Sequence, residues 1–127
     1  MVPASQRVLI VDDDRLVADT LGLIFEKSGF DAFACYSAEE ALKHARGFHP
    51  QLLLCDVAMP GRDGIALVHD ISQEFPSCRF LVLTGFHGNL HRVRQCADRI
   101  SMPVGVFTKP CPPADLLREA NAMLANA

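Results

Sequence analysis

The sequence lacks several features that would place it in a specialised class of protein. No long basic run is present that could neutralise a row of phosphates, and the formal net charge is −3, from 12 Lys and Arg against 15 Asp and Glu. No apolar run approaches the roughly 20 residues needed to cross a bilayer, and the amino-terminal segment has no signal-peptide core. These absences argue against direct binding of nucleic acid and against a membrane span.

Closely spaced cysteine pairs are also missing. The cysteines are odd in number and scattered, without the short spacing of a zinc site or the density of a disulfide scaffold: Cys35, Cys55, Cys78, Cys96 and Cys111. We therefore expect reduced thiols in a cytoplasmic protein. A chain of 127 residues that is 50% hydrophobic and 21% charged has the composition of a globular protein with one core, which predicts a single domain over residues 1–127.

What the sequence does contain is a repeated alternation of a short apolar run with a longer segment of helical period. We expect strands at residues 8–11, 30–36, 52–55, 80–83 and 104–108, and helices at 15–28, between Ser37 and His49, from Gly64 to Phe75, at 90–97 and at 114–124. The unbroken apolar character of the first and third runs is typical of parallel strands that are covered on both faces. The pattern predicts an α/β fold with an open, doubly wound sheet of five parallel strands.

Polar side chains follow four of the expected strands directly. They are Asp12 and Asp13 after the first, Asp56 after the third, Thr84 after the fourth and Lys109 after the fifth. In an open doubly wound sheet, ligands bind beyond the carboxyl ends of the strands, so these side chains should converge on one crevice.

Such a group of carboxylates needs a compensating charge. Two carboxylates about 4 Å apart repel by roughly 4 kcal/mol at an effective dielectric constant near 20. A raised pKa, a lysine partner or a divalent cation can offset that repulsion, and an all-oxygen site suits Mg²⁺ best, with Mn²⁺ as a substitute. A carboxylate beside a cation, with a hydroxyl and an ammonium in reach, can accept a phosphoryl group. The alternative is that these aspartates only stabilise turns and helix starts. That role explains neither the spacing of the aspartates nor the presence of Lys109 after the last strand.

Four segments, VLIVDDD, LLLCDVAMPGRDG, FLVLTG and VFTKP, resemble in order and spacing the four motifs of response-regulator receiver domains in two-component signalling. The resemblance covers residues 7–124. It implies a flavodoxin-like sheet of strand order 2-1-3-4-5 with five flanking helices. It also implies a phosphorylation-dependent signalling switch rather than an enzyme that acts on a separate substrate.

The resemblance assigns a role to each polar residue of the crevice. Asp56 would be the phosphoacceptor, Thr84 the switch hydroxyl and Lys109 the active-site lysine. The phosphoryl group would come from a sensor histidine kinase or a histidine phosphotransfer protein. The output partner and any homodimer are left open, and this segment is not expected to bind nucleic acid or a membrane.

The resemblance also implies a metal site. Asp13 and Asp56 would bind Mg²⁺ directly, Asp12 would act mostly through water, and the backbone carbonyl of Ala58 would complete the protein ligands. The Lys109–Pro110 peptide bond would be cis, which is least costly before proline.

One position departs from the family pattern. Receivers typically carry Tyr or Phe three residues before the lysine, where this chain has Val106. Phe107 is one residue further along and should point to the opposite face of the strand, which suggests an altered output surface.

Three other functions compete with the switch. A pseudo-receiver keeps the fold without phosphorylation, but such proteins lose acidic residues or the lysine, and this chain keeps them all. Hydrolases of the aspartyl-phosphate type normally carry a second Asp two residues after the nucleophile, where this chain has Ala58. A flavin-binding protein is disfavoured because the acidic loop after the first strand would repel the flavin phosphate.

Overall fold

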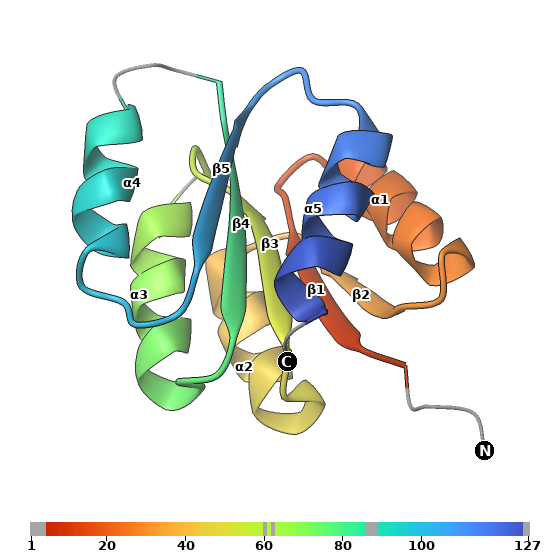
Figure 1. Ribbon diagram of the computed structural model, residues 1–127, viewed down its shortest axis with the longest axis horizontal. Coiled ribbons are helices and arrows are strands. Elements are labelled where there is room, and N and C mark those ends of the chain that lie inside the picture. The colour runs from red at the N-terminus through yellow and green to blue at the C-terminus, as the bar shows by residue number, and fades with distance from the viewer. Residues whose placement is uncertain (1–4, 60, 62, 86–88, 126–127) are drawn as a thin grey trace.

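The computed structural model describes residues 5–59, 61, 63–85 and 89–125 and contains one parallel sheet (Figure 1). Its strands are β1 (Arg7–Val11), β2 (Asp31–Cys35), β3 (Leu52–Asp56), β4 (Arg79–Thr84) and β5 (Val104–Thr108). They are arranged in the order β2-β1-β3-β4-β5, and every neighbouring pair is parallel. The expected fold class and strand order are therefore confirmed.

Five helices in the described part of the chain cover the two faces of the sheet. They are α1 (Arg15–Lys27), α2 (Ala38–Phe48), α3 (Gly64–Glu74), α4 (Asn89–Ala97) and α5 (Pro113–Leu124). Helices α1 and α5 lie on one face, and α2, α3 and α4 lie on the other (Figure 1). No described helix is both long enough and apolar enough to span a membrane.

The sheet divides the apolar core into two clusters because successive side chains of a strand point to opposite faces. In β1, Val8 and Ile10 pack in the cluster under α1 and α5, whereas Leu9 and Val11 pack in the cluster under α2, α3 and α4. Strands β1 and β3 are buried along almost their whole length. This explains their unbroken apolar sequences, since a central parallel strand has no solvent-facing side.

The helix boundaries follow local capping chemistry. Ser37 accepts a hydrogen bond from the backbone N–H of Glu40 at the start of α2, as the spacing of these two residues predicts. Gly29 follows α1 with a φ of 98°, and His49 ends α2 with a φ of 53°. Both residues therefore turn the chain out of the helix through the left-handed region.

The expected elements differ from the observed ones only at their ends. β2 is one residue shorter at each end than the expected 30–36, and β3 continues through Asp56. The Lys109–Pro110 bond is cis, as expected. Val106 packs in the cluster on the α4 side and Phe107 packs on the α5 side, so the prediction that they point to opposite faces is confirmed.

Candidate functional site

The carboxyl ends of the strands bring the expected polar residues to one edge of the sheet, at the top of Figure 1. Asp12 follows β1, Asp56 ends β3, Thr84 ends β4 and Lys109 follows β5. Asp12 is 2% exposed, Asp56 6% and Thr84 0%. A buried carboxylate requires compensation by a counter-charge, a proton or a metal ion, so the surroundings of these two acids decide what the pocket can do.

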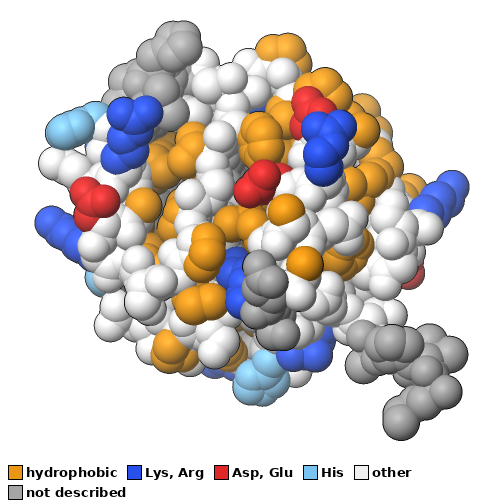
Figure 2. Space-filling view, in the orientation of Figure 1, with side chains coloured by type: hydrophobic (Ala, Val, Ile, Leu, Met, Phe, Trp, Pro, Cys, Tyr) orange, Lys and Arg blue, Asp and Glu red, His pale blue; other side chains and the backbone are white. Residues whose placement is uncertain are grey.

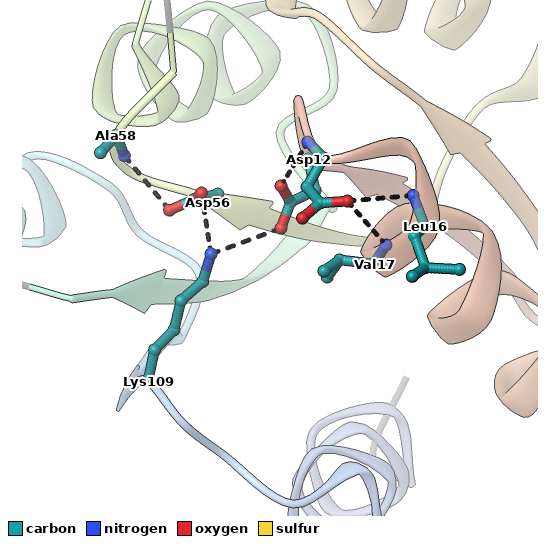
Figure 3. Close-up of polar contacts among 7 residues, drawn as sticks. Asp12, Leu16, Val17, Asp56, Ala58 and Lys109 are labelled. Atoms are coloured by element: carbon teal, nitrogen blue, oxygen red, sulfur yellow. Dashed lines mark hydrogen bonds and ion pairs between the residues drawn. The ribbon is translucent and has the colours of Figure 1, made fainter.

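Lys109 supplies a counter-charge to both buried acids. Its Nζ lies 2.9 Å from Oδ2 of Asp56 and 3.4 Å from Oδ2 of Asp12. Figure 3 shows the lysine side chain reaching up between the two carboxylates. The Lys109 side chain is 35% exposed and the side chains of the two acids are nearly inaccessible, so the lysine is the more accessible partner in both ion pairs.

The pKa values show how burial and charge compete in this pocket. Burial raises the pKa of Asp12, and the hydrogen bond from the backbone N–H of Asp14 and the charge of Lys109 offset this only in part. Burial lowers the pKa of Lys109, but the hydrogen bond to Asp56 and the charges of both acids outweigh it, and the net pKa is raised. The lysine is thus held in its charged form, while the ionised form of Asp12 remains costly.

Three carboxylates could hold a cation. Asp12, Asp13 and Asp56 each offer one oxygen, and the three oxygens lie within 4.8 Å of one another. Asp13 is exposed whereas the other two are buried, so an ion would have an open side toward water. An all-oxygen set of this kind, with room for water ligands, fits the preference of Mg²⁺.

Backbone contacts fix the two buried carboxylates. Oδ1 of Asp12 accepts the backbone N–H of Asp14 at 2.9 Å, and Oδ1 of Asp56 accepts that of Ala58 at 3.2 Å (Figure 3). In each acid, the other oxygen faces Lys109. Because each carboxylate oxygen has two lone pairs, these contacts leave acceptor capacity for a cation or a phosphoryl group.

The third acid of the first motif has a different role. Asp14 is the N-cap of α1, and its Oδ1 accepts the backbone N–H groups of Leu16 and Val17 at 3.1 and 3.3 Å. Helix-cap chemistry is therefore the right interpretation for Asp14, while the neighbouring acids face the pocket.

Two residues near the site were not expected to contribute to it. Gly64 begins α3, donates its N–H to the carbonyl of Val57 at 3.0 Å and packs directly on the backbone of Asp56. Asp63 is the N-cap of α3 and binds the backbone N–H of Ala66 and the side chain of Arg92. An Asp directly before a helix start is a cap signal that could have identified Asp63, whereas no pattern along the chain reports the close contact at Gly64.

We expect Gly64→Ala to destabilise the protein. A Cβ at this position would collide with the carbonyl oxygen of Asp56 and lie 2.9 Å from its carbonyl carbon, and backbone cannot rotate away as a flexible side chain can. The expected loss is about 1–3 kcal/mol of unfolding free energy, measured by urea denaturation.

A matched control for this change is Gly47→Ala in α2. A Cβ at Gly47 would meet no atom within 4 Å, and alanine favours the helix by about 0.5–1 kcal/mol, so this variant should be more stable than the wild type. Equal unfolding free energies for the two variants would contradict the close contact at Gly64.

A mostly apolar groove adjoins the pocket on the side of α1 and α5. It has a volume of about 680 Å³ and includes Lys109 and Pro110 in its lining. Its walls come from α1, including Leu16, which is 76% exposed, and from the start of α5.

The fold and the pocket together define a doubly wound α/β protein with three acids and a lysine at the carboxyl ends of its strands. The chain belongs to the response regulator receiver domain family, whose model matches residues 8–121. Receivers of this family are signalling switches of two-component systems, and they bind Mg²⁺ at an acidic pocket.

Solved structures agree with this assignment. The chain is similar to a CheY-like response regulator receiver domain protein from Methanospirillum hungatei, with 25% identity, a TM-score of 0.86, and coverage of 97% of this chain and 96% of that one. A two-component transcriptional regulator AraC from Clostridium phytofermentans is 27% identical, with a TM-score of 0.83 and coverage of 95% and 94%. The receiver domain of a signal transduction histidine kinase from Syntrophus aciditrophicus, at 24% identity, a TM-score of 0.85 and coverage of 97% and 92%, shows the shared fold.

Proposed function

We propose that this protein is a phosphoacceptor switch in which Asp56 receives a phosphoryl group. One observation supports this most strongly: the Lys109 ammonium lies between two buried carboxylates, and the oxygen of a third acid lies within 4.8 Å of theirs. A purely structural ion pair needs one acid, whereas transfer of a phosphoryl group needs a nucleophile and several groups that neutralise charge.

The proposed reaction is a simple displacement. A carboxylate oxygen of Asp56 forms a bond to the phosphorus of the donor, and the bond from phosphorus to the donor breaks, so that its electron pair stays on the donor. Lys109 would stabilise negative charge on the phosphoryl oxygens, and the Thr84 hydroxyl would donate a hydrogen bond to one of them. The product is an acyl phosphate on Asp56, with no other covalent change in the chain.

The residues of the pocket fit a magnesium ion. Asp13 and Asp56 would bind it directly, Asp12 would act mostly through water, and the carbonyl of Ala58 would be the remaining protein ligand. When bound, the ion would neutralise charge on the acids and on the phosphoryl oxygens. Mn²⁺ has similar ligand preferences and should substitute for it.

The partners in this proposal follow from the reaction. The donor would be a sensor histidine kinase or a histidine phosphotransfer protein, because a phosphohistidine supplies a reactive phosphorus–nitrogen bond. The acceptor is the protein itself, so the only chemistry is its own phosphorylation and dephosphorylation. A cytoplasmic location and a single domain over residues 1–127 stay predictions, and homodimer formation stays an open question.

The first test is the intact mass of the wild-type protein after incubation with acetyl phosphate. With Mg²⁺ or Mn²⁺ present, we expect a single phosphoryl adduct. Chelation of the metal should reduce its rate of formation by at least about 10²-fold, because charge neutralisation in the site is lost.

The absence of an adduct on folded protein with Mg²⁺ would contradict the proposal. It would instead favour a pseudo-receiver, an interaction module that keeps the pocket without the chemistry. Continuous release of phosphate without a detectable adduct would favour a hydrolase of the aspartyl-phosphate type.

A further inference from the structure

An ion pair joins the start of α3 to α4 on the side of the molecule away from Lys109. Oδ2 of Asp63 lies 2.7 Å from Nη2 of Arg92, while Oδ1 of the same carboxylate accepts the backbone N–H of Ala66 at 2.9 Å. The Asp63 side chain is 28% exposed and that of Arg92 is 52% exposed. The two oxygens of the acid therefore have separate roles, since one caps α3 and the other holds α4.

Asp63 is connected to the phosphoacceptor through backbone contacts. Its neighbour Gly64 packs against the carbonyl group of Asp56 and donates its N–H to the carbonyl of Val57 at 3.0 Å. Val57 in turn donates its N–H to the carbonyl of Leu83 in β4 at 2.9 Å. The close approach of Gly64 to the carbonyl of Asp56, together with its hydrogen bond to Val57, links the backbone at Asp56 directly to the start of α3.

α4 is also held by apolar and weak polar contacts, some of them with α3. Val93 is 2% exposed and packs in the apolar cluster beneath α2, α3 and α4. The thiol of Cys96 lies 3.9 Å from the carbonyl of Ile65, a weak contact. Among the residues that the structure describes, the strong polar contact between α4 and the loop after β3 is thus the pair of Arg92 with Asp63.

From this geometry we infer that the Asp63–Arg92 ion pair couples the state of Asp56 to the position of α4. The inference rests on the proposed function, since it needs a phosphoryl group to arrive at Asp56. Phosphorylation turns a carboxylate of charge −1 into an acyl phosphate with nearly two negative charges, so about one negative charge is added at the end of β3. Asp63 moves with the start of α3, so its 2.7 Å contact with Arg92 breaks and α4 is then held only by its weaker contacts with the apolar cluster.

The charge of Asp63 suits this role. Burial raises its pKa, but the hydrogen bonds from Ala66 and Arg92 outweigh that effect, and the net pKa lies below its ordinary value. The carboxylate is therefore ionised near neutral pH. It loses a charged partner, and not only a hydrogen bond, when Arg92 moves away.

The test is hydrogen–deuterium exchange of the α4 amides in the wild type and in Arg92→Gln, before and after phosphorylation by acetyl phosphate with Mg²⁺. In the wild type, phosphorylation should speed exchange in α4 by about two- to fivefold, the range of effects expected for an exposed ion pair. In unphosphorylated Arg92→Gln, the α4 amides should already exchange about two- to fivefold faster than in the unphosphorylated wild type. Phosphorylation of this variant should not change their exchange rate further.

Two further variants separate the ion pair from other effects. Asp63→Asn can still cap α3 but loses its charge, so it should behave like Arg92→Gln, and the double variant should show no additional effect. Arg94→Gln removes an exposed charge from the same helix, where Figure 2 shows basic side chains projecting at the left of the view. Because Arg94 forms no ion pair with another described residue, this variant should respond like the wild type.

Two results would overturn the inference while the proposed function stands. One is an α4 response in Arg92→Gln equal to that of the wild type. The other is fully phosphorylated wild type, shown by intact mass, with no change in α4. Failure of the wild type to form the adduct is visible in the same mass measurement and would overturn the proposed function itself.

Discussion

Asp56→Asn should form no phosphoryl adduct with acetyl phosphate and Mg²⁺, while the wild type is modified. The amide is isosteric with the carboxylate and can still accept the backbone N–H of Ala58, so the fold should be retained. An amide oxygen is a far weaker nucleophile, however, and the variant also removes a negative charge that faces Lys109 at 2.9 Å. Intact mass measures the adduct, and circular dichroism checks the fold.

The matched control for this variant is Asp14→Asn. It makes the same chemical change in the same acidic cluster, but Asp14 caps α1, and asparagine caps a helix equally well. Asp14→Asn should therefore take up one phosphoryl group as the wild type does. An adduct on Asp56→Asn would show that a different residue, such as Asp13, is the nucleophile.

Lys109→Ala should slow formation of the adduct by about 10²–10³-fold. This is the usual loss when one group that stabilises transition-state charge is removed. The ammonium group contacts the reacting carboxylate directly, so the loss should appear in the rate of the chemical step. A time course of intact mass measures this rate, with Lys43→Ala in α2 as a control.

The same variant should bind Mg²⁺ more tightly, by about tenfold or 1.4 kcal/mol, because a competing positive charge is gone. It should also be less stable without metal, since Asp12 and Asp56 lose their shared counter-charge, and Mg²⁺ should restore the loss. Calorimetric titration measures the affinity, and urea denaturation measures the stability. Slower phosphorylation with weaker binding of Mg²⁺ would mean that the lysine builds the metal site rather than competing with the metal.

Much of the fold was predictable from the sequence because its strands are central and parallel. β1 and β3 are buried on both faces, so their apolar runs stand out from the amphipathic helices between them. The candidate site was predictable for a related reason. Parallel strands end at one edge, so residues that follow the strands meet there, and Lys109 lies 2.9 Å from Asp56 although 53 positions separate them.

The parts of the site that could not be predicted depend on contacts without a sequence pattern. Asp63 and Arg92 are 29 positions apart, on a loop and a helix whose relative placement is set by packing. Gly64 resembles any glycine at a helix start, and only the position of the Asp56 carbonyl shows that no side chain fits. Likewise, the sequence groups Asp12, Asp13 and Asp14 together, but burial and hydrogen bonds separate the helix cap from the pocket acids.

The sheet divides the core and so separates the face formed by α1 and α5 from the face that carries α4. Within the described part of the chain, the apolar cluster under α1 and α5 shares no side chain with the cluster that carries α4. A rearrangement that runs from Asp56 through Asp63 to Arg92 would stay on the α4 side. A protein seated in the groove between α1 and α5 would meet Lys109, which pairs with Asp56, but its contacts with the two helices would lie outside that rearrangement. Recruitment of a donor and release of a signal could then proceed on opposite sides of the sheet, without competing for one surface.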